Sequence, residues 1–266
     1  MRLYLPKHLP GTPPYVIAHR GISSKAPENT LASFKQAASI PGVDMIELDV
    51  RLTKDEEVIV LHDRTLQRTT TGNGPVRNYS LEEIRRLDAG SWFHPMFAEQ
   101  RIPTLAEVFQ HVGNRLWIDV EIKSDRLHRE LPGLLEEKVL DVVNKCGMDD
   151  NVLFSSFDHQ ILSNIRRIKS SAVTGVLFDL FRDFGRLPSK LAGRVGAKVF
   201  KCATHELTHK MLNDAHKHNI AVYVYTLNSV QGVQRMLDYG VDGILSNNAD
   251  DIVRVVKSYN PVDSFC

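Results

Sequence analysis

The sequence predicts an α/β fold, a (β/α)8 TIM barrel with a small insertion after the second strand. Short apolar runs of strand type alternate with amphipathic segments of helix type along the chain. Eight such pairs fit within 266 residues, which is close to the usual length of about 250 residues for this barrel. One long stretch, at about 63–103, interrupts the alternation and is expected to be an insertion. We therefore treat 1–266 as one barrel domain, with a doubly wound open sheet as the alternative.

The expected strands are short apolar runs that end at polar residues or turn formers. A shorter run, Val58–His62, predicts an extra strand directly before the insertion. Because the loops at the carboxyl ends of barrel strands carry function, we expect the insertion to lie on that face. In chain order the eight main strands are Tyr15–His19, Met45–Leu52, Leu116–Lys123, Val152–Phe157, Ala172–Phe178, Lys198–Cys202, Ala221–Leu227 and Gly243–Asn247.

Helical segments follow most of these strands. Ser80 and Thr104 are each followed three residues later by a glutamate, which is the spacing of a capping box at a helix start. The segment after the fifth strand, Phe181–Arg194, predicts the weakest helix because it contains two glycines and a proline. The other helices are expected at Thr30–Ser39, Thr104–His111, Leu134–Cys146, His159–Lys169, Thr208–His218, Val230–Tyr239 and Ala249–Tyr259.

The composition is that of an ordinary soluble globular protein, with 42% hydrophobic and 24% charged residues. A net charge of +1 gives no indication of nucleic-acid binding, and no apolar stretch reaches the roughly 18 residues that an integral membrane segment needs. The three cysteines stand far apart, and the N-terminal residues lack the continuous apolar core of a signal peptide. We therefore expect a cytoplasmic protein, and nothing in the sequence indicates its oligomeric state.

Charged side chains recur on one face of two expected strands. Alternate residues of a strand share a face, so Glu47 lies with Asp49, and Asp119 lies with Glu121 and Lys123. In a barrel that face is the interior, where several carboxylates together need compensating positive charge. Arg and Lys side chains could supply it as a structural ion-pair cluster. A divalent cation, Mg²⁺ or Ca²⁺, would suit the carboxylate oxygens better.

Two histidines and an arginine join these carboxylates at the strand ends. His19 and Arg20 end the first strand, and His62 ends the extra strand. Two histidines suit general base and general acid roles near neutral pH, and the arginine fork matches a phosphate group. A cation beside them would stabilise the charge of a phosphate or its transition state. The set of side chains therefore indicates metal-assisted cleavage of a phosphate ester.

The motifs also resemble those of a known family. The segments AHRGISSKAPENTLASF, DMIELDVRLTKDEEVIVLHDRTLQRTTTGNG, VEIK, FSSFD, VYTLN and DGILSN are similar to the glycerophosphodiester phosphodiesterase family, in family order and across nearly the whole chain. The resemblance implies hydrolysis of a glycerophosphodiester to sn-glycerol 3-phosphate and an alcohol, on a (β/α)8 barrel with a divalent metal. It implies an acid–base pair, His19 as base and His62 as acid, the metal ligands Glu47, Asp49 and Glu121, and the phosphate contacts Arg20 and Lys123.

Further residues are candidates for the substrate pocket or for supporting roles. Glu28 and Asn29 lie near this site in relatives, although Asn29 could equally cap the first helix. Tyr225, where the family commonly has Trp, could offer a π face to a choline ammonium, and His205 could line the pocket. Outside the resemblance, Asp119 is expected to be a buried ion-pair partner.

Other functions compete with this interpretation. His205-Glu-Leu-Thr-His209 matches the zinc-peptidase motif H-E-x-x-H, but that motif requires one continuous helix, and Thr208 is expected to begin the helix here. A lysophospholipase D on the same barrel would need an apolar surface beside the site, for which Phe93, Met96 and Phe97 of the insertion are the only hint. A non-catalytic phosphate-binding relative would have lost a histidine or a ligand, and this chain retains them all.

Overall fold

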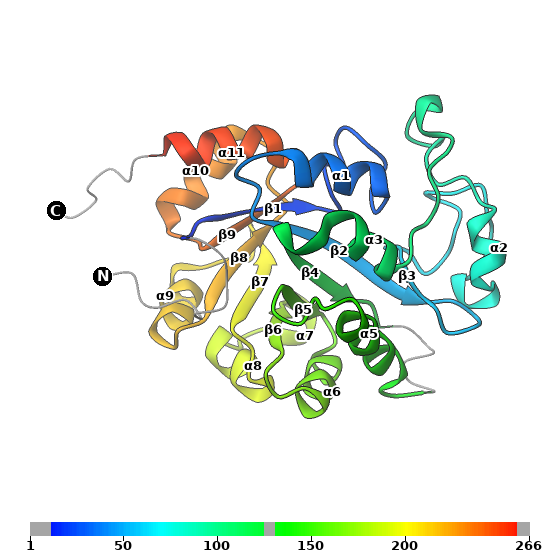
Figure 1. The fold of residues 1–266 in the computed structure, drawn as a ribbon. Coiled ribbons are helices and arrows are strands. Elements are labelled where there is room, and N and C mark those ends of the chain that lie inside the picture. Colours follow the sequence, from blue (N-terminus) through cyan, green and yellow to red (C-terminus); the bar gives the residue numbers. More distant parts are fainter. Residues whose placement is uncertain (1–11, 125–130, 260–266) are drawn as a thin grey trace.

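The barrel closes through its first and last strands. In the computed structural model, which describes residues 12–124 and 131–259, β1 (Tyr15–His19) pairs in parallel with both β2 (Met45–Leu52) and β9 (Gly243–Ser246). The other neighbours in the barrel are also parallel, in the order β1-β9-β8-β7-β6-β5-β4-β2. In an open sheet β1 and β2 would lie at opposite edges and would not pair. Because they pair here, the doubly wound alternative is wrong and the (β/α)8 barrel is confirmed (Figure 1).

The remaining barrel strands lie close to their predicted positions. They are β4 (Trp117–Ile122), β5 (Val152–Ser156), β6 (Val173–Leu177), β7 (Val199–Ala203) and β8 (Ala221–Tyr225). The helices around them are α1 (Leu31–Ser39), α3 (Leu105–Val112), α5 (Leu134–Lys145), α6 (His159–Ile168), α7 (Leu180–Asp183), α8 (Pro188–Val195), α9 (His209–Lys217), α10 (Val230–Tyr239) and α11 (Ala249–Ser258), and a 3-10 turn, η3 (Gly113–Arg115), leads into β4.

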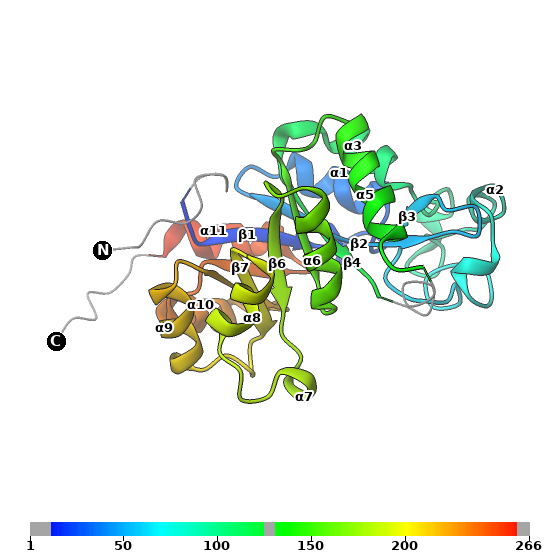
Figure 2. The ribbon, with the colours of Figure 1, turned by 90° about the horizontal axis from the view of Figure 1, so that it is seen from below.

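The expected weak helix after the fifth barrel strand, β6, is two short helices. α7 ends at Asp183, Gly185 adopts a left-handed φ of 76°, and α8 begins at Pro188. Glycine tolerates that backbone conformation and proline suits a first helical turn, so the same residues that weaken one long helix define the break between two. The α7 segment projects beyond the ends of the strands (Figure 2).

The inward-facing side chains change from apolar to charged along the strands. At the amino ends of the strands the barrel is filled by a cluster that includes Tyr15, Met45, Trp117 and Tyr223. Outward-facing residues of the same strands pack under the helices in the large core. The apolar layer closes the bottom of the barrel, so the charged layer above it lies at the carboxyl ends of the strands, where barrel enzymes place their sites.

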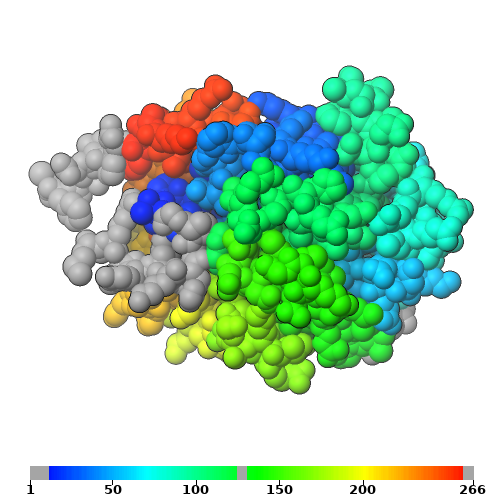
Figure 3. Space-filling model, viewed as in Figure 1, coloured from blue at the N-terminus to red at the C-terminus, as the bar shows by residue number. Residues whose placement is uncertain are grey.

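The insertion begins as an antiparallel extension of β2. β3 (Val58–Val60) pairs with the last residues of β2, and η1 (Val76–Asn78), α2 (Leu81–Arg85) and η2 (Pro95–Phe97) follow. Ser80 and Thr104 form the two predicted capping boxes. The insertion has its own small core, made by Ile59, Leu61, Leu66, Val76, Ile84, Ala89 and Ile102. In the space-filling view it forms one end of the molecule and adjoins the barrel (Figure 3).

No helix within residues 12–124 and 131–259 combines the length and the hydropathy needed to cross a membrane. The expectation about the N-terminal residues concerns positions 1–11, which lie outside the described residues.

We predict that Gly243→Ala destabilises the barrel. A Cβ at Gly243 would lie 2.5 Å from Cδ1 of the buried Tyr223 ring, so the apolar layer would have to shift. Overpacking of this kind costs about 1–3 kcal/mol in the free energy of unfolding, which denaturant titration would measure. Gly193→Ala is the matched control, because its Cβ would meet nothing within 4 Å on an exposed helical position, and it should be neutral or stabilising. Equal effects of the two substitutions would contradict the prediction.

Candidate active site

Three carboxylates meet at the carboxyl ends of β2 and β4. The two strands are in register, with Asp49 beside Glu121 and Glu47 beside Asp119. Glu47, Asp49 and Glu121 are all buried, and one carboxylate oxygen from each lies within 4.8 Å of the others. Alternation along two neighbouring strands is sufficient to build this cluster, as the sequence predicts.

Two cations bind the same carboxylates. Nζ of Lys123 lies 2.8 Å from Oδ1 of Asp49 and also contacts Glu121, and Nε of Arg20 lies 3.2 Å from Oδ2 of Asp49. Burial opposes the charge of Asp49, but Lys123 and Arg20 outweigh it and hold the pKa of Asp49 far below its usual value. At Glu47 burial and the neighbouring Asp49 act together and raise the pKa well above its usual value.

The donor set fits a hard divalent cation. Its oxygens come only from carboxylates, which Mg²⁺ and Ca²⁺ prefer to nitrogen or sulfur ligands. Burial and the neighbouring Asp49 both oppose ionisation of Glu47, so keeping it charged needs additional positive charge. A divalent ion held by Glu47, Asp49 and Glu121 would supply the missing positive charge.

His19 is the last residue of β1 and lies in register with Glu47. Its Nδ1 donates to Oδ1 of Asn247 at 2.7 Å, which leaves Nε2 as the unprotonated nitrogen of the neutral ring, 3.9 Å from Oε2 of Glu47. Burial, reinforced by the charge of Arg20, lowers the pKa of His19 to about 4. The ring is therefore neutral at pH 7, with Nε2 able to accept a proton.

The turn after His19 directs Arg20 toward the carboxylates. Arg20 and Gly21 both have left-handed φ angles, of 57° and 81°, and the backbone N–H of Arg20 donates to the carbonyl of Glu47 at 2.9 Å. A Cβ at Gly21 would lie 2.4 Å from Oγ of Ser33 on α1, so this position requires glycine. The Arg20 guanidinium also donates from Nη1 to Oε1 of Glu28 at 2.9 Å.

His62 follows β3 and is fastened to the end of β2. The N–H of Leu61 donates to the carbonyl of Asp49 at 2.9 Å, and the Arg51 guanidinium donates to the carbonyl of His62 at 2.7 and 3.0 Å. Nδ1 of His62 contacts Oδ1 of Asp63 at 2.6 Å. The insertion thus brings its histidine to the carboxylate cluster by main-chain pairing, and Asp63 orients the ring.

Asn29 contacts the site and does not cap α1. Its Nδ2 donates to Oδ2 of Asp49 at 2.8 Å, whereas the cap is Thr30, whose side chain accepts from the N–H of Ser33. The capping alternative for Asn29 is therefore wrong. A left-handed φ of 58° at Asn29 turns the chain so that the side chain reaches β2 while the next residue starts the helix.

The H-E-x-x-H segment does not form a zinc-binding helix. α9 begins only at His209, with Thr208 as its cap, and His205 lies exposed in the turn after β7. Glu206 accepts from the backbone N–H of Ala203 at 2.8 Å, and His209 stacks on Tyr239. The two histidines therefore do not share a helix face, and the motif match is a coincidence of sequence.

Tyr225, the last residue of β8, is half-buried near the same end of the barrel. Burial raises its pKa, so the phenol stays neutral.

The structure brings His19, Arg20, His62, Lys123 and the three carboxylates into one connected cluster, whereas His205 lies in the exposed turn.

Sequence reasoning missed Lys201, which lies inside the barrel beneath the carboxylates. Its Nζ donates to Oδ2 of Asp119 at 2.6 Å and to Oγ of Ser155 at 3.1 Å, and its side chain is fully buried. Asp119 is therefore the buried ion-pair partner that the sequence predicts. A signal was present, because Lys201 is a lone cation at an inward position of an otherwise apolar strand.

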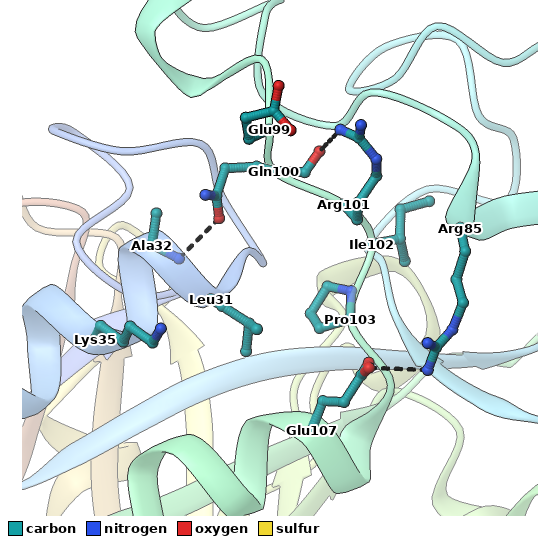
Figure 4. Close-up of a pocket in the computed structure, with 10 residues that line it drawn as sticks. All are labelled: Leu31, Ala32, Lys35, Arg85, Glu99, Gln100, Arg101, Ile102, Pro103 and Glu107. Atoms are coloured by element: carbon teal, nitrogen blue, oxygen red, sulfur yellow. Dashed lines mark hydrogen bonds and ion pairs between the residues drawn. The ribbon is translucent and has the colours of Figure 1, made fainter.

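A cavity of about 550 Å³ lies outside this cluster, between α1, the end of the insertion and α3. Its polar groups bind one another (Figure 4): Oε1 of Gln100 accepts from the N–H of Ala32, and Arg85 pairs with Glu107. These contacts attach the insertion to the helices.

The family model and the relatives that match this chain all point to the same family. The model of the glycerophosphoryl diester phosphodiesterase family matches residues 19–251. A glycerophosphodiester phosphodiesterase of Caldanaerobacter subterraneus subsp. tengcongensis is 36% identical over 244 residues, covering 91% of this chain and 97% of its own. One from Bacillus subtilis is 30% identical over 266 residues, covering 91% and 86%.

A solved structure has the same architecture. A phosphodiesterase of Oleispira antarctica, in complex with the product sn-glycerol-3-phosphate, superposes with a TM-score of 0.85 at 26% identity, covering 92% of this chain and 97% of its own. The fold of this chain is therefore that of the Oleispira antarctica phosphodiesterase.

We predict that Lys201→Met strongly destabilises the protein. The substitution would leave the buried carboxylate of Asp119 without its ion-pair partner, at a cost of about 3–5 kcal/mol in the free energy of unfolding. Lys145→Met is the matched control, because Lys145 pairs with Asp141 on an exposed helix face and should change stability by less than about 1 kcal/mol. Chemical denaturation of both variants would measure the difference, and a loss at Lys201 no larger than at Lys145 would refute the assignment.

Proposed function

The chain belongs to the glycerophosphoryl diester phosphodiesterase family and is therefore a phosphodiesterase, and we propose that it hydrolyses glycerophosphodiesters with a divalent metal and two histidines. The products would be sn-glycerol 3-phosphate and an alcohol such as choline or ethanolamine. The observation that carries the proposal is the convergence of His19, Arg20 and His62 on the buried carboxylate cluster. The product bound by the Oleispira antarctica phosphodiesterase supports the substrate class.

Glu47, Asp49 and Glu121 would hold the metal, Mg²⁺ or Ca²⁺. When bound, that ion would neutralise charge on the phosphate oxygens of the substrate. Arg20 would contact the same phosphate with the part of its guanidinium that Asp49 and Glu28 leave available, and Lys123 would supply a second positive charge.

His19 would act as the base. Because its Nδ1–H is held by Asn247, Nε2 is free to take the proton from the attacking oxygen, either water or the glycerol 2-hydroxyl. His62 would act as the acid and protonate the departing alcohol, which would otherwise leave as a poor alkoxide. Asp63 supports this role because a carboxylate at Nδ1 stabilises positive charge on the ring and leaves Nε2–H as the donor.

A lysophospholipase D activity is the second candidate, and exposed apolar side chains favour it. Phe181 in α7 and Phe184 directly after it are 95% and 80% exposed, and Met96 of the insertion is 75% exposed. α7 follows β6 at the catalytic end of the barrel, where such a surface could meet an acyl chain. Comparing kcat/KM for lysophosphatidylcholine and glycerophosphocholine would decide between the two candidates.

The whole chain would serve as one catalytic domain, with 63–103 as its insertion, because the insertion's core includes β3 residues of the extended sheet. Its partner would be the small-molecule diester, without nucleic acid. The free thiols of Cys146 and Cys202 favour a reducing, cytoplasmic location. Tyr225 would contact the head group and Glu28 would hold Arg20 in the pocket.

We predict release of glycerol 3-phosphate from glycerophosphocholine that requires Mg²⁺ or Ca²⁺ and stops in EDTA. His19→Ala and His62→Ala should each lower kcat by about 10²–10⁴-fold, because each removes one proton transfer. His111→Ala is the control, since His111 is exposed in the last turn of the outer helix α3, and it should keep wild-type kcat. A folded wild-type protein that releases no product with either metal would refute the proposed function.

We also predict that Glu47→Gln and Glu121→Gln weaken binding of Mg²⁺ or Ca²⁺ by at least about tenfold, measured by calorimetry without substrate. Each substitution removes one carboxylate charge from the donor set while keeping its shape. Glu107→Gln, in the cavity away from the cluster, should leave the affinity unchanged. Equal affinities in all three variants would contradict the assignment of the ligands.

A further inference from the structure

One guanidinium in the insertion contacts two carboxylates that serve different sides of the site. Nε and Nη2 of Arg68 donate to the two oxygens of Asp63 at 2.6 and 3.0 Å. Nη1 and Nη2 donate to the two oxygens of Glu28 at 2.9 and 2.7 Å. Arg68 therefore makes a bidentate contact on each side, which fixes its plane relative to both carboxylates.

The contacts continue in both directions to residues of the proposed mechanism. Beyond Asp63 lies Nδ1 of His62 at 2.6 Å, and beyond Glu28 lies Nη1 of Arg20 at 2.9 Å. Arg20 in turn reaches Asp49 at 3.2 Å. The result is an unbroken series of alternating charges from the carboxylate cluster to His62.

This arrangement differs from an ordinary surface ion pair. An isolated exposed pair contributes little, because two flexible side chains must be held for one weak attraction. Here Arg68 makes four hydrogen bonds to two partly buried carboxylates, and Glu28 is also held by Arg20. The Arg68 contact lowers the pKa of Asp63 to about 2, so Asp63 is charged whenever the enzyme works near neutral pH.

We propose that Arg68 is a positioning residue that holds the Asp63–His62 pair in place for proton delivery to the leaving alcohol. The inference rests on the proposed function and adds a residue that acts through Asp63 without touching the substrate. His62 sits in a loop after a three-residue strand, so its main chain alone does not fix the ring. Arg68 fixes the carboxylate of Asp63 by two hydrogen bonds, and its anchor at Glu28 ties that carboxylate to the barrel.

The kinetic test separates the proton delivered by His62 from the rest of catalysis. Arg68→Gln should lower kcat on glycerophosphocholine, which needs a protonated leaving group, by about tenfold or more. On the p-nitrophenyl diester of glycerol 3-phosphate, whose phenolate leaves without a proton, the loss should be under about threefold. Arg68→Lys should lose less kcat than Arg68→Gln, because a lysine keeps the positive charge but cannot make two hydrogen bonds to each carboxylate. Equal losses on the two substrates would overturn the proposal.

Arg86→Gln is the matched control. Arg86 lies in the same insertion and pairs only with the exposed Glu82 among the contacts described, so it should leave both activities unchanged. Thermal unfolding of all variants checks that the insertion stays folded. Because the Arg68 side chain is 43% exposed, its replacement opens no cavity in the core.

A second readout does not depend on activity. The ring-nitrogen NMR signals of His62, assigned by their loss in His62→Gln, should show the Nδ1–H tautomer for the neutral ring of the wild-type protein, to which the acid form adds a proton at Nε2. Arg68→Gln should shift them toward the Nε2–H tautomer, as Asp63→Ala should, and Arg86→Gln should not. Unchanged signals in Arg68→Gln would overturn the proposal even if the enzyme is active. If the wild-type protein were inactive, the proposed function would fail and these signals would still decide the role of Arg68.

Discussion

The structure depends on the compensation of like charges inside a barrel. Glu47, Asp49 and Glu121 are buried within a few ångströms of one another, which is costly unless positive charge is placed beside them. Arg20 and Lys123 supply positive charge, and Lys201 adds more from below. The strand register, the left-handed turn at Arg20 and the pairing of β3 with β2 each serve to bring these charges together.

The two histidines differ in the partner that holds Nδ1. A neutral amide, Asn247, holds His19 at the end of β1, whereas a carboxylate, Asp63, holds His62. An amide fixes the ring without stabilising a charge on it, and a carboxylate does both. Under the proposed mechanism, two side chains of one type would then perform opposite proton transfers, with the difference set by the residues that contact Nδ1.

Much of the fold and of the carboxylate cluster could be predicted because it follows from local pattern. Alternation in Met45–Leu52 and in β4 places the carboxylates, and capping-box spacing marks two helix starts. The positions of Lys201, Asn247 and Arg68 could not be predicted in this way. Their partners are 82, 228 and 40 residues distant in sequence, so only the closed barrel and the folded insertion bring them together.

The two ends of the insertion meet at one place on the barrel. The N–H of Val60 donates to the carbonyl of Pro103 at 2.8 Å, and Ile59 pairs with Thr104 where the chain enters α3. A segment that leaves and returns between hydrogen-bonded neighbours can change in length with little strain on its host. The part of the insertion that follows Arg68 is thus a place where loops of other sequence could be exchanged to build chimeric enzymes that keep both histidines.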